Sequence, residues 1–381
     1  MNRASITGRD PASGNPISVE IEGDRIARVV DTAELNDLWI SSGLIDLQVN
    51  GYRGLNLNGE GTTADTVSEL TREMLVNGAT TYAPTVVSAP EPLMLHRLAC
   101  IAEAYHADAV VRRCVPYIHV EGPHISPIDG YRGAHPLAAV RPPALEEFER
   151  WQAACRGLVG LVTISPHFPR VEEYIAALVA KGVHVAIGHT HASAEQIRRA
   201  VDAGARLSTH LGNGIATQLD RHPNPIWSQL AEDRLTASFI ADGQHLPAEA
   251  LRAMIRAKGL ERSLLVSDVV SLGGMPAGVY TLPTGPVELT SGGRLEVMGT
   301  QLLAGAVVPL ISCVDGVVRM AGLSLADGLR MATEIPGRFA GGRGRLSPGQ
   351  RADVLRFRWT DGTPLIVADV WLAGEAVFPS R

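Results

Sequence analysis

Eight short apolar segments recur along the middle of this chain, and helical patterns separate several of them. This alternation limits the possible fold more than any other feature. Val171–Val179 places its apolar residues on one helical face before Gly182, and Ser193–Gln196 has the residues of a capping box. Strand–helix repeats of this kind predict an α/β fold, a TIM-type (β/α)8 barrel. The predicted strands lie near Leu44–Val49, Thr80–Val87, Val115–Glu121, Gly160–Ser165, His184–His189, Arg206–His210, Thr236–Ala241 and Leu264–Asp268.

Both ends of the chain show a different pattern, the alternation of apolar and polar residues that is typical of half-buried strands. Near the N-terminus, Ile17–Glu22 and Arg25–Val29 flank the turn at Gly23 and Asp24, which predicts a hairpin. Near the C-terminus the pattern returns in Ala352–Phe357, Leu365–Leu372 and Gly374–Val377. We therefore predict a small β-sandwich domain built from both termini, residues 1–41 plus 346–381, beside a barrel of residues 42–345.

Length and charge narrow the class of protein. A single core rarely serves more than about 250–300 residues, so the 381 residues of this chain suit a large barrel plus a small domain. The formal net charge is −6, from 34 basic and 40 acidic residues, and there is no run of Lys and Arg. This composition argues against a nucleic-acid partner.

Membrane insertion and secretion are also not expected. Two uncharged stretches, residues 269–287 and 297–314, are interrupted by Gly and Pro, so we expect buried barrel segments and no membrane partner. The first residues lack the apolar core of a secretory signal. The four cysteines show no C-x-x-C spacing, so we expect reduced thiols in a cytoplasmic protein.

Polar and titratable residues recur where the predicted strands end. In a barrel of this type the carboxyl ends of the strands converge on one mouth, so these residues predict a functional site there. The residues with this placement are Asp46, Gln48, Asn50, Glu121, His189, His210, Asp242, His245 and Asp268.

Glu121, His189 and His210 form the most informative subset. They lie too far apart in sequence for a short zinc motif, and a single histidine is more often a hydrogen-bonded core residue. One carboxylate and two imidazoles at neighbouring strand ends nevertheless match a common ligand set of catalytic Zn2+, with a fourth position left for water. Asp268 follows the apolar run Leu264–Val266, where its carboxylate either serves as a general base or caps the next helix.

The motifs at these strand ends, in this order, resemble those of the amidohydrolase superfamily, and within it the N-acetylglucosamine-6-phosphate deacetylases. The tail Gly344–Asp353 resembles the segment that leads back into the small domain of such enzymes, so the resemblance covers essentially the whole chain. The segments that carry it are Ser42–Gly51, His119–Pro123, Gly133–Pro136, Gly188–Thr190, Ser208–Leu211, Ala241–His245 and Val266–Asp268.

The resemblance implies a metal-dependent amide hydrolase. Glu121, His189 and His210 would hold one divalent metal ion, for which Zn2+ is favoured and Fe2+, Mn2+ or Co2+ are alternatives. Asp268 would act as general base and then as general acid, and His135 would polarise the acetyl carbonyl. The His-x-His pair of the superfamily is replaced here by Gln48 and Asn50, near Asp46, which implies a site for a single metal ion.

The implied reaction converts N-acetylglucosamine 6-phosphate and water into glucosamine 6-phosphate and acetate, in a homodimer. Arg221 matches the phosphate-binding arginine of the family, and a guanidinium suits bidentate pairing with phosphate. The other residues that match substrate contacts are Ala134, His135, Asn213, Gly214, Asp242, His245, Ala304, Gly305 and Ala306.

Some segments that would face the substrate depart from the family pattern. Leu211–Ile215 lacks the usual aromatic residue and methionine, and His222–Trp227 replaces a Glu-Pro-Gly sequence. The chemistry is therefore better specified than the substrate. The same amide hydrolysis on N-acetylgalactosamine 6-phosphate or an N-acyl amino acid stays open, and so does a non-catalytic barrel scaffold.

Overall fold

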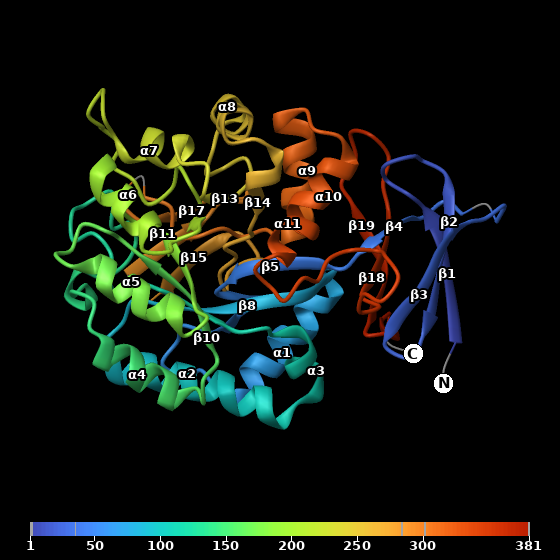
Figure 1. Ribbon diagram of the computed structural model, residues 1–381, viewed down its shortest axis with the longest axis horizontal. Coiled ribbons are helices and arrows are strands. Elements are labelled where there is room, and N and C mark those ends of the chain that lie inside the picture. Colours follow the sequence, from blue (N-terminus) through green and yellow to red (C-terminus); the bar gives the residue numbers. More distant parts are fainter. Residues whose placement is uncertain (1–2, 35, 283–284, 301, 380–381) are drawn as a thin grey trace.

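The computed structural model describes residues 3–34, 36–282, 285–300 and 302–379, and its centre is a sheet of eight parallel strands (Figure 1). The sheet closes into a barrel between its first and last strands, where Asn50 N–H donates to the Val269 carbonyl at 2.8 Å and Asp268 N–H donates to the Gln48 carbonyl at 3.0 Å. The predicted (β/α)8 barrel is thus confirmed. In chain order the strands are β5 (Leu44–Val49), β8 (Ala79–Val87), β9 (Ile118–Glu121), β10 (Val159–Ile164), β11 (His184–Ile187), β12 (Leu207–Ser208), β13 (Thr236–Phe239) and β14 (Ser263–Leu265).

Helices surround the barrel because their apolar faces pack on the outward side chains of the strands. Both helices that the sequence marked are present: α5 begins at Val171, and α6 follows the N-cap Ser193, whose side chain exchanges capping-box bonds with Gln196. The helices are α1 (Ala64–Val76), α2 (Glu91–Ala107), α3 (Ala109–Cys114), α4 (Leu145–Ala154), α5 (Val171–Ala180), α6 (Ala194–Asp202), α7 (Pro225–Ala231), α8 (Ala248–Lys258), α9 (Leu310–Ala321), α10 (Leu325–Ala332) and α11 (Glu334–Gly337).

Five barrel strands, β10 to β14, end one to three residues earlier than predicted, and three of them end two or three residues before His189, His210 and Asp268. His189, His210 and Asp268 have φ values of 47°, 29° and 52°, in the left-handed region that non-glycine residues rarely adopt. This conformation interrupts the regular strand geometry, and β11, β12 and β14 end two or three residues before it. Strained backbone of this kind often marks a functional site.

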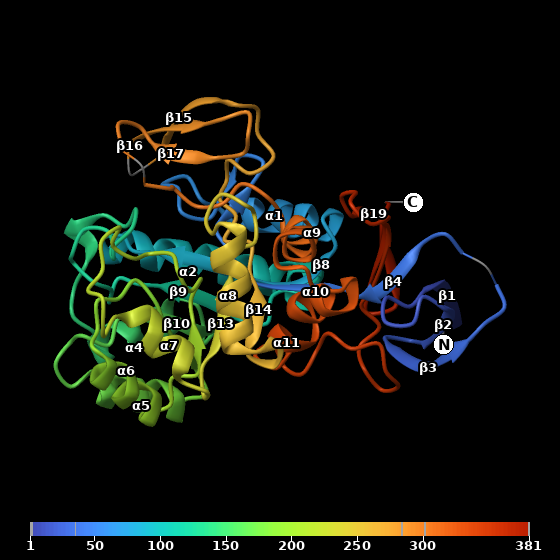
Figure 2. The same cartoon turned by 90° about the horizontal axis from the view of Figure 1, so that it is seen from above.

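The β-sandwich domain expected from the two termini is present at one end of the molecule (Figures 1 and 2). Segments far apart in sequence meet there, because β4 (Trp39–Ser42) pairs antiparallel with β18 (Val354–Arg358). The division at residues 41/42 and 345/346 is our proposal for the domain boundary. The remaining strands of this seven-stranded sheet are β1 (Arg3–Arg9), β2 (Pro16–Glu22), β3 (Arg25–Asp31), β19 (Ile366–Leu372) and β20 (Glu375–Phe378).

The expectation that residues 269–287 are a buried barrel segment is wrong for most of their length. They contribute to a separate antiparallel sheet of β15 (Gly278–Leu282), β16 (Gly285–Leu289) and β17 (Leu295–Val297), which projects from the barrel in Figure 2. The sheet has a small apolar core of its own, and Val279 on it is 63% exposed. Within the described ranges, no helix is both long and apolar enough to cross a lipid bilayer.

Candidate metal centre and active site

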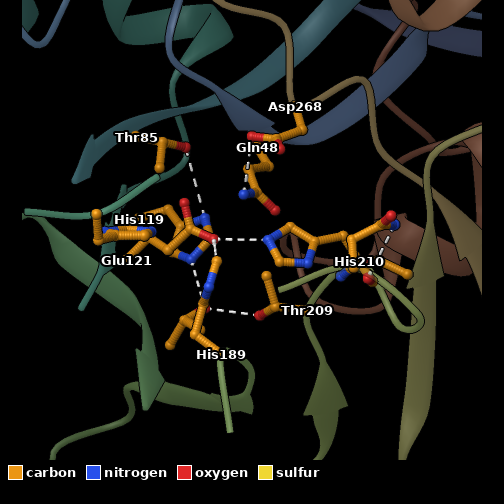
Figure 3. A network of polar contacts seen from close by, with 12 residues as sticks. Gln48, Thr85, His119, Glu121, His189, Thr209, His210 and Asp268 are labelled. Carbon is orange, nitrogen blue, oxygen red and sulfur yellow. Dashed lines mark hydrogen bonds and ion pairs between the residues drawn. The ribbon is translucent and has the colours of Figure 1, made fainter. Parts of the chain in front are cut away.

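Glu121, His189 and His210 meet at the mouth of the barrel (Figure 3). Glu121 ends β9, and the two histidines follow β11 and β12 by two residues each. Glu121 Oε1 lies 2.9 Å from His210 Nε2 and 3.3 Å from His189 Nε2, and all three side chains are buried. One ligand atom from each residue lies within 4.8 Å of the others, so the predicted ligand set is assembled in space.

The surroundings of these side chains fit a divalent cation. The His189 Nδ1–H can donate to the Tyr131 carbonyl at 3.0 Å, which leaves the Nε2 lone pair directed at the cluster. Burial alone would raise the pKa of Glu121, but the hydrogen bonds and charges of His189 and His210 hold that pKa well below its usual range. The carboxylate therefore stays ionised, and two nitrogens and one charged oxygen are the donor types that Zn2+ and similar ions prefer.

Asp268 is held by two side-chain amides, those of Gln48 and Asn50. Gln48 Nε2 donates to Asp268 Oδ1 at 3.0 Å, and Asn50 Nδ2 donates to the same oxygen at 2.8 Å. Among the described residues no group donates a hydrogen bond to Asp268 Oδ2, so this oxygen is the one available for proton transfer. Burial and the charge of Glu121 raise the pKa of Asp268 to about 7, a value suited to a group that takes and returns a proton near neutral pH.

His135 lies beside the cluster on the loop between β9 and α4. Its ring is 8% exposed and packs edge-to-face on His189, with 4.5 Å between the ring centroids. Burial, followed by the charge of His189, lowers the pKa of His135 to about 3. The imidazole is therefore neutral at neutral pH. Ala134, another predicted substrate contact, lies directly before His135 and is half-buried.

Several residues matched to substrate contacts also border the mouth. A Cβ on Gly214 would stand 2.5 Å from His189 Nδ1, so the loop approaches the cluster as closely as a glycine permits. Asn213 Nδ2 donates to the His210 carbonyl at 3.2 Å. His245 Nδ1 and Asp242 Oδ2 form a largely buried pair at 2.8 Å.

Two other predicted substrate contacts differ in how close they lie to the cluster. The segment Ala304–Ala306 runs beside Asp268, and Ala306 N–H donates to the Asp268 carbonyl at 3.3 Å. Arg221, in contrast, is exposed in the loop between β12 and α7, and the structure gives it no ion pair among the described residues. The structure thus brings the three predicted metal ligands, Asp268 and His135 together, and leaves Arg221 on the periphery.

The sequence analysis did not identify the polar residues that bond Asn50 and His135. Asn58 Nδ2 donates to the Thr85 carbonyl at 2.9 Å and lies 3.4 Å from Asn50 Oδ1, and Ser88 Oγ lies 2.8 Å from His135 Nδ1. Neither residue is titratable, so neither is marked in the sequence as an acid, a base or a metal ligand. Ser88 directly follows β8, however, so the search at strand ends would have found it if serines had been included.

Asp46 has a structural place in the same region. Its Oδ1 accepts the backbone N–H groups of Gln48 and Ser267, at 3.3 and 3.1 Å, and so joins β5 to the segment that carries Asp268. Burial raises the pKa of Asp46 to about 6, although the bonds from Ser267 oppose the shift. Asp46 therefore helps to close the barrel at the point where Asp268 enters the mouth.

Known proteins resemble this chain over most of its length, although no protein-family model matches it. The N-acetylgalactosamine-6-phosphate deacetylase of Shewanella sp. (strain ANA-3) is 33% identical, over 89% of this chain and 83% of that relative. The N-acetylglucosamine-6-phosphate deacetylase of Homo sapiens is also 33% identical, with the same coverage of 89% and 83%. A mutant N-acetyl-D-glucosamine-6-phosphate deacetylase from Mycobacterium smegmatis, solved in complex with N-acetyl-D-glucosamine-6-phosphate, is 28% identical with a TM-score of 0.88, over 99% of this chain and 100% of that one.

Proposed function

Because this chain belongs to the amino-sugar-phosphate deacetylases of the amidohydrolase superfamily, we propose that it hydrolyses the N-acetyl amide of N-acetylglucosamine 6-phosphate, giving glucosamine 6-phosphate and acetate. The observation that carries this proposal is the buried Glu121, His189 and His210 cluster with Asp268 fixed beside it. A scaffold protein without catalysis has no need of a base whose carboxylate is held by two amides.

The roles of the residues follow from their hydrogen bonds. Glu121, His189 and His210 would hold one divalent cation, which when bound acidifies water and polarises the amide carbonyl. Asp268 takes a proton from the attacking water at Oδ2, since Oδ1 already accepts hydrogen bonds from the side-chain amides of Gln48 and Asn50. The same carboxyl returns the proton to the amide nitrogen as the C–N bond breaks. His135 is neutral and donates a hydrogen bond to the carbonyl oxygen as negative charge develops there.

We favour Zn2+ as the metal because the ligand set contains two imidazoles and one carboxylate. Fe2+, Mn2+ and Co2+ suit the same ligands, and elemental analysis of the purified protein identifies the ion. We also propose that the protein is a cytoplasmic homodimer. Its four cysteines are all free and buried, which agrees with a reducing compartment.

N-acetylgalactosamine 6-phosphate is the second candidate substrate. It is favoured by the Shewanella relative, which is as similar to this chain as the human N-acetylglucosamine-6-phosphate deacetylase is. The two sugars differ only in configuration at one ring carbon, so the amide chemistry proposed above serves both. Asn213, Gly214, Asp242, His245 and the segment Ala304–Ala306 are proposed to line the sugar site.

Acetate release from the metal-loaded protein decides between the substrates. We expect kcat/KM above about 10^4 M⁻¹s⁻¹ on N-acetylglucosamine 6-phosphate, which is within the normal range of enzymes. N-acetylgalactosamine 6-phosphate and unphosphorylated N-acetylglucosamine are measured in parallel. A preference for the galacto epimer would replace the first substrate by the second, and no activity on either phosphate with metal bound would exclude both.

Arg221→Ala is expected to raise KM for the sugar phosphate at least about tenfold with a smaller change in kcat, because a guanidinium–phosphate pair adds binding rather than proton transfer. Arg221→Lys keeps the charge but loses bidentate pairing, so its KM should lie between those of the wild type and Arg221→Ala. Steady-state kinetics of the three enzymes test this. Unchanged KM in Arg221→Ala would show that Arg221 does not bind the phosphate.

A further inference from the structure

We propose that Ser88 is a positioning residue for catalysis, which fixes the tautomer of His135 so that the ring presents its Nε2–H to the acetamide carbonyl of the substrate. The proposal rests on the function proposed above. It concerns a serine that has no acid, base or metal-binding chemistry of its own. Its evidence is the hydrogen-bond geometry around one buried hydroxyl group.

Ser88 lies directly after β8, and its side chain contacts His135. Its side chain is 3% exposed, and Ser88 Oγ lies 2.8 Å from His135 Nδ1. The His135 ring also packs edge-to-face with His189, with 4.5 Å between the ring centroids. The hydroxyl group therefore holds one nitrogen of the imidazole and leaves the other nitrogen for the site.

The position of the protons follows from what each group can donate. If Ser88 donates to Nδ1, the hydroxyl hydrogen has a partner and the ring carries its own hydrogen on Nε2. If Nδ1–H donated instead, the buried hydroxyl hydrogen would need another acceptor. The structure shows no second hydrogen-bond partner for Ser88 Oγ among the residues it describes, and an unpaired buried donor is costly. The first arrangement is therefore favoured.

The space for this hydroxyl is provided by the residue that follows the metal ligand Glu121. A Cβ on Gly122 would stand 2.2 Å from Ser88 Oγ, and Gly122 has a φ of 76°. Any larger residue there would both strain the backbone and displace the hydroxyl. The glycine after Glu121 therefore leaves the space that the Ser88 hydroxyl occupies beside His135.

The consequence is chemical. Only a nitrogen that carries hydrogen can stabilise the negative charge that develops on a carbonyl oxygen during hydrolysis. A neutral imidazole has a single N–H, so its tautomer decides whether His135 can donate to the substrate at all. Ser88 holds the ring in the productive form before the substrate arrives.

The test compares three variants with the wild type. Ser88→Ala should lower kcat about 10- to 100-fold, the usual effect of losing such a supporting bond, while KM changes less than about threefold. Ser88→Thr keeps a hydroxyl group and should recover most of kcat. Ser165→Ala is the matched control, because Ser165 Oγ also bonds a histidine, His167 Nδ1 at 2.7 Å. Its other partner is Thr190 Oγ1 at 2.7 Å, and neither partner belongs to the cluster or contacts Ser88, so kcat should stay within about threefold of wild type.

A second measurement does not depend on turnover. Nitrogen-15 NMR of histidine-labelled, metal-free protein reports the tautomer of His135, whose signals are assigned by their loss in His135→Gln. We expect the Nε2–H form in the wild type and a mixture of forms in Ser88→Ala. A wild-type ring with its hydrogen on Nδ1, or a Ser88→Ala enzyme with normal kcat, would overturn the proposal. A wild type that is inactive on every sugar tested would refute the proposed function alone, because the tautomer is still measured.

Discussion

Asp268→Asn is expected to bind metal normally and to lose at least about 10^3-fold in kcat, within the range that general acid–base catalysis contributes. The substitution is isosteric, and the oxygen of the new amide can still accept the bonds from Gln48 and Asn50 that Asp268 Oδ1 accepts now. What is lost is the basic oxygen at the Oδ2 position. Acetate release and metal content, measured on the same preparation, test this prediction.

A matched control separates this effect from the loss of any buried carboxylate. Asp315 is 6% exposed and pairs with Arg319 on α9, away from the cluster. Asp315→Asn should therefore keep kcat within about threefold of wild type, in line with the small effect of changes outside a site. If Asp268→Asn retained comparable turnover, the proton-transfer role of Asp268 would be wrong.

Glu121→Gln is expected to release the metal and, with it, the activity. The carboxylate is the only charged ligand of the cluster, and a neutral amide oxygen is a much poorer ligand for Zn2+. We expect metal content to fall from about one ion per chain to below about 0.1, with kcat reduced at least about 100-fold, as expected when catalysis depends on the metal. Elemental analysis and acetate release are the measurements.

Thermal unfolding gives an independent readout of the same change. An ion present at about 1,000 times its Kd stabilises the folded protein by about 4 kcal/mol, so added Zn2+ should raise the Tm of the wild type but not that of Glu121→Gln. Asp353→Asn is the control, because Asp353 is buried and paired with Arg351 at the small domain. It should respond to Zn2+ as the wild type does. A Glu121→Gln protein that retained its metal would exclude Glu121 as a required ligand.

The fold was readable from the sequence because its signals are local. Each barrel strand is a short apolar run, α5 has a one-sided apolar pattern, and α6 has its capping box at Ser193. The sheet of β15, β16 and β17 was not predicted. An uncharged stretch has the same sequence pattern whether it packs in the barrel or in a separate small core. Uncharged composition indicates burial somewhere, but it does not identify the partner.

The ends of the barrel strands show a similar limit. The sequence predicted that the strands continue to His189, His210 and Asp268, whereas all three residues have left-handed backbone. Nothing in their side chains requires this conformation. The three residues stand where the chain leaves the barrel strands, and the strands beside them are far away in the sequence.

The sequence by itself determined the barrel, the small terminal domain and the chemical types at the mouth, because strand-end position and side-chain chemistry are properties of each segment alone. Only the tertiary structure decided which atoms meet. The side-chain amides of Gln48 and Asn50, in and just after β5, both donate to one oxygen of Asp268. The Ser88 hydroxyl group contacts His135, which lies 47 positions further along the sequence. Such contacts join the ends of strands that lie side by side in the folded barrel but far apart in the sequence, so no local pattern records them.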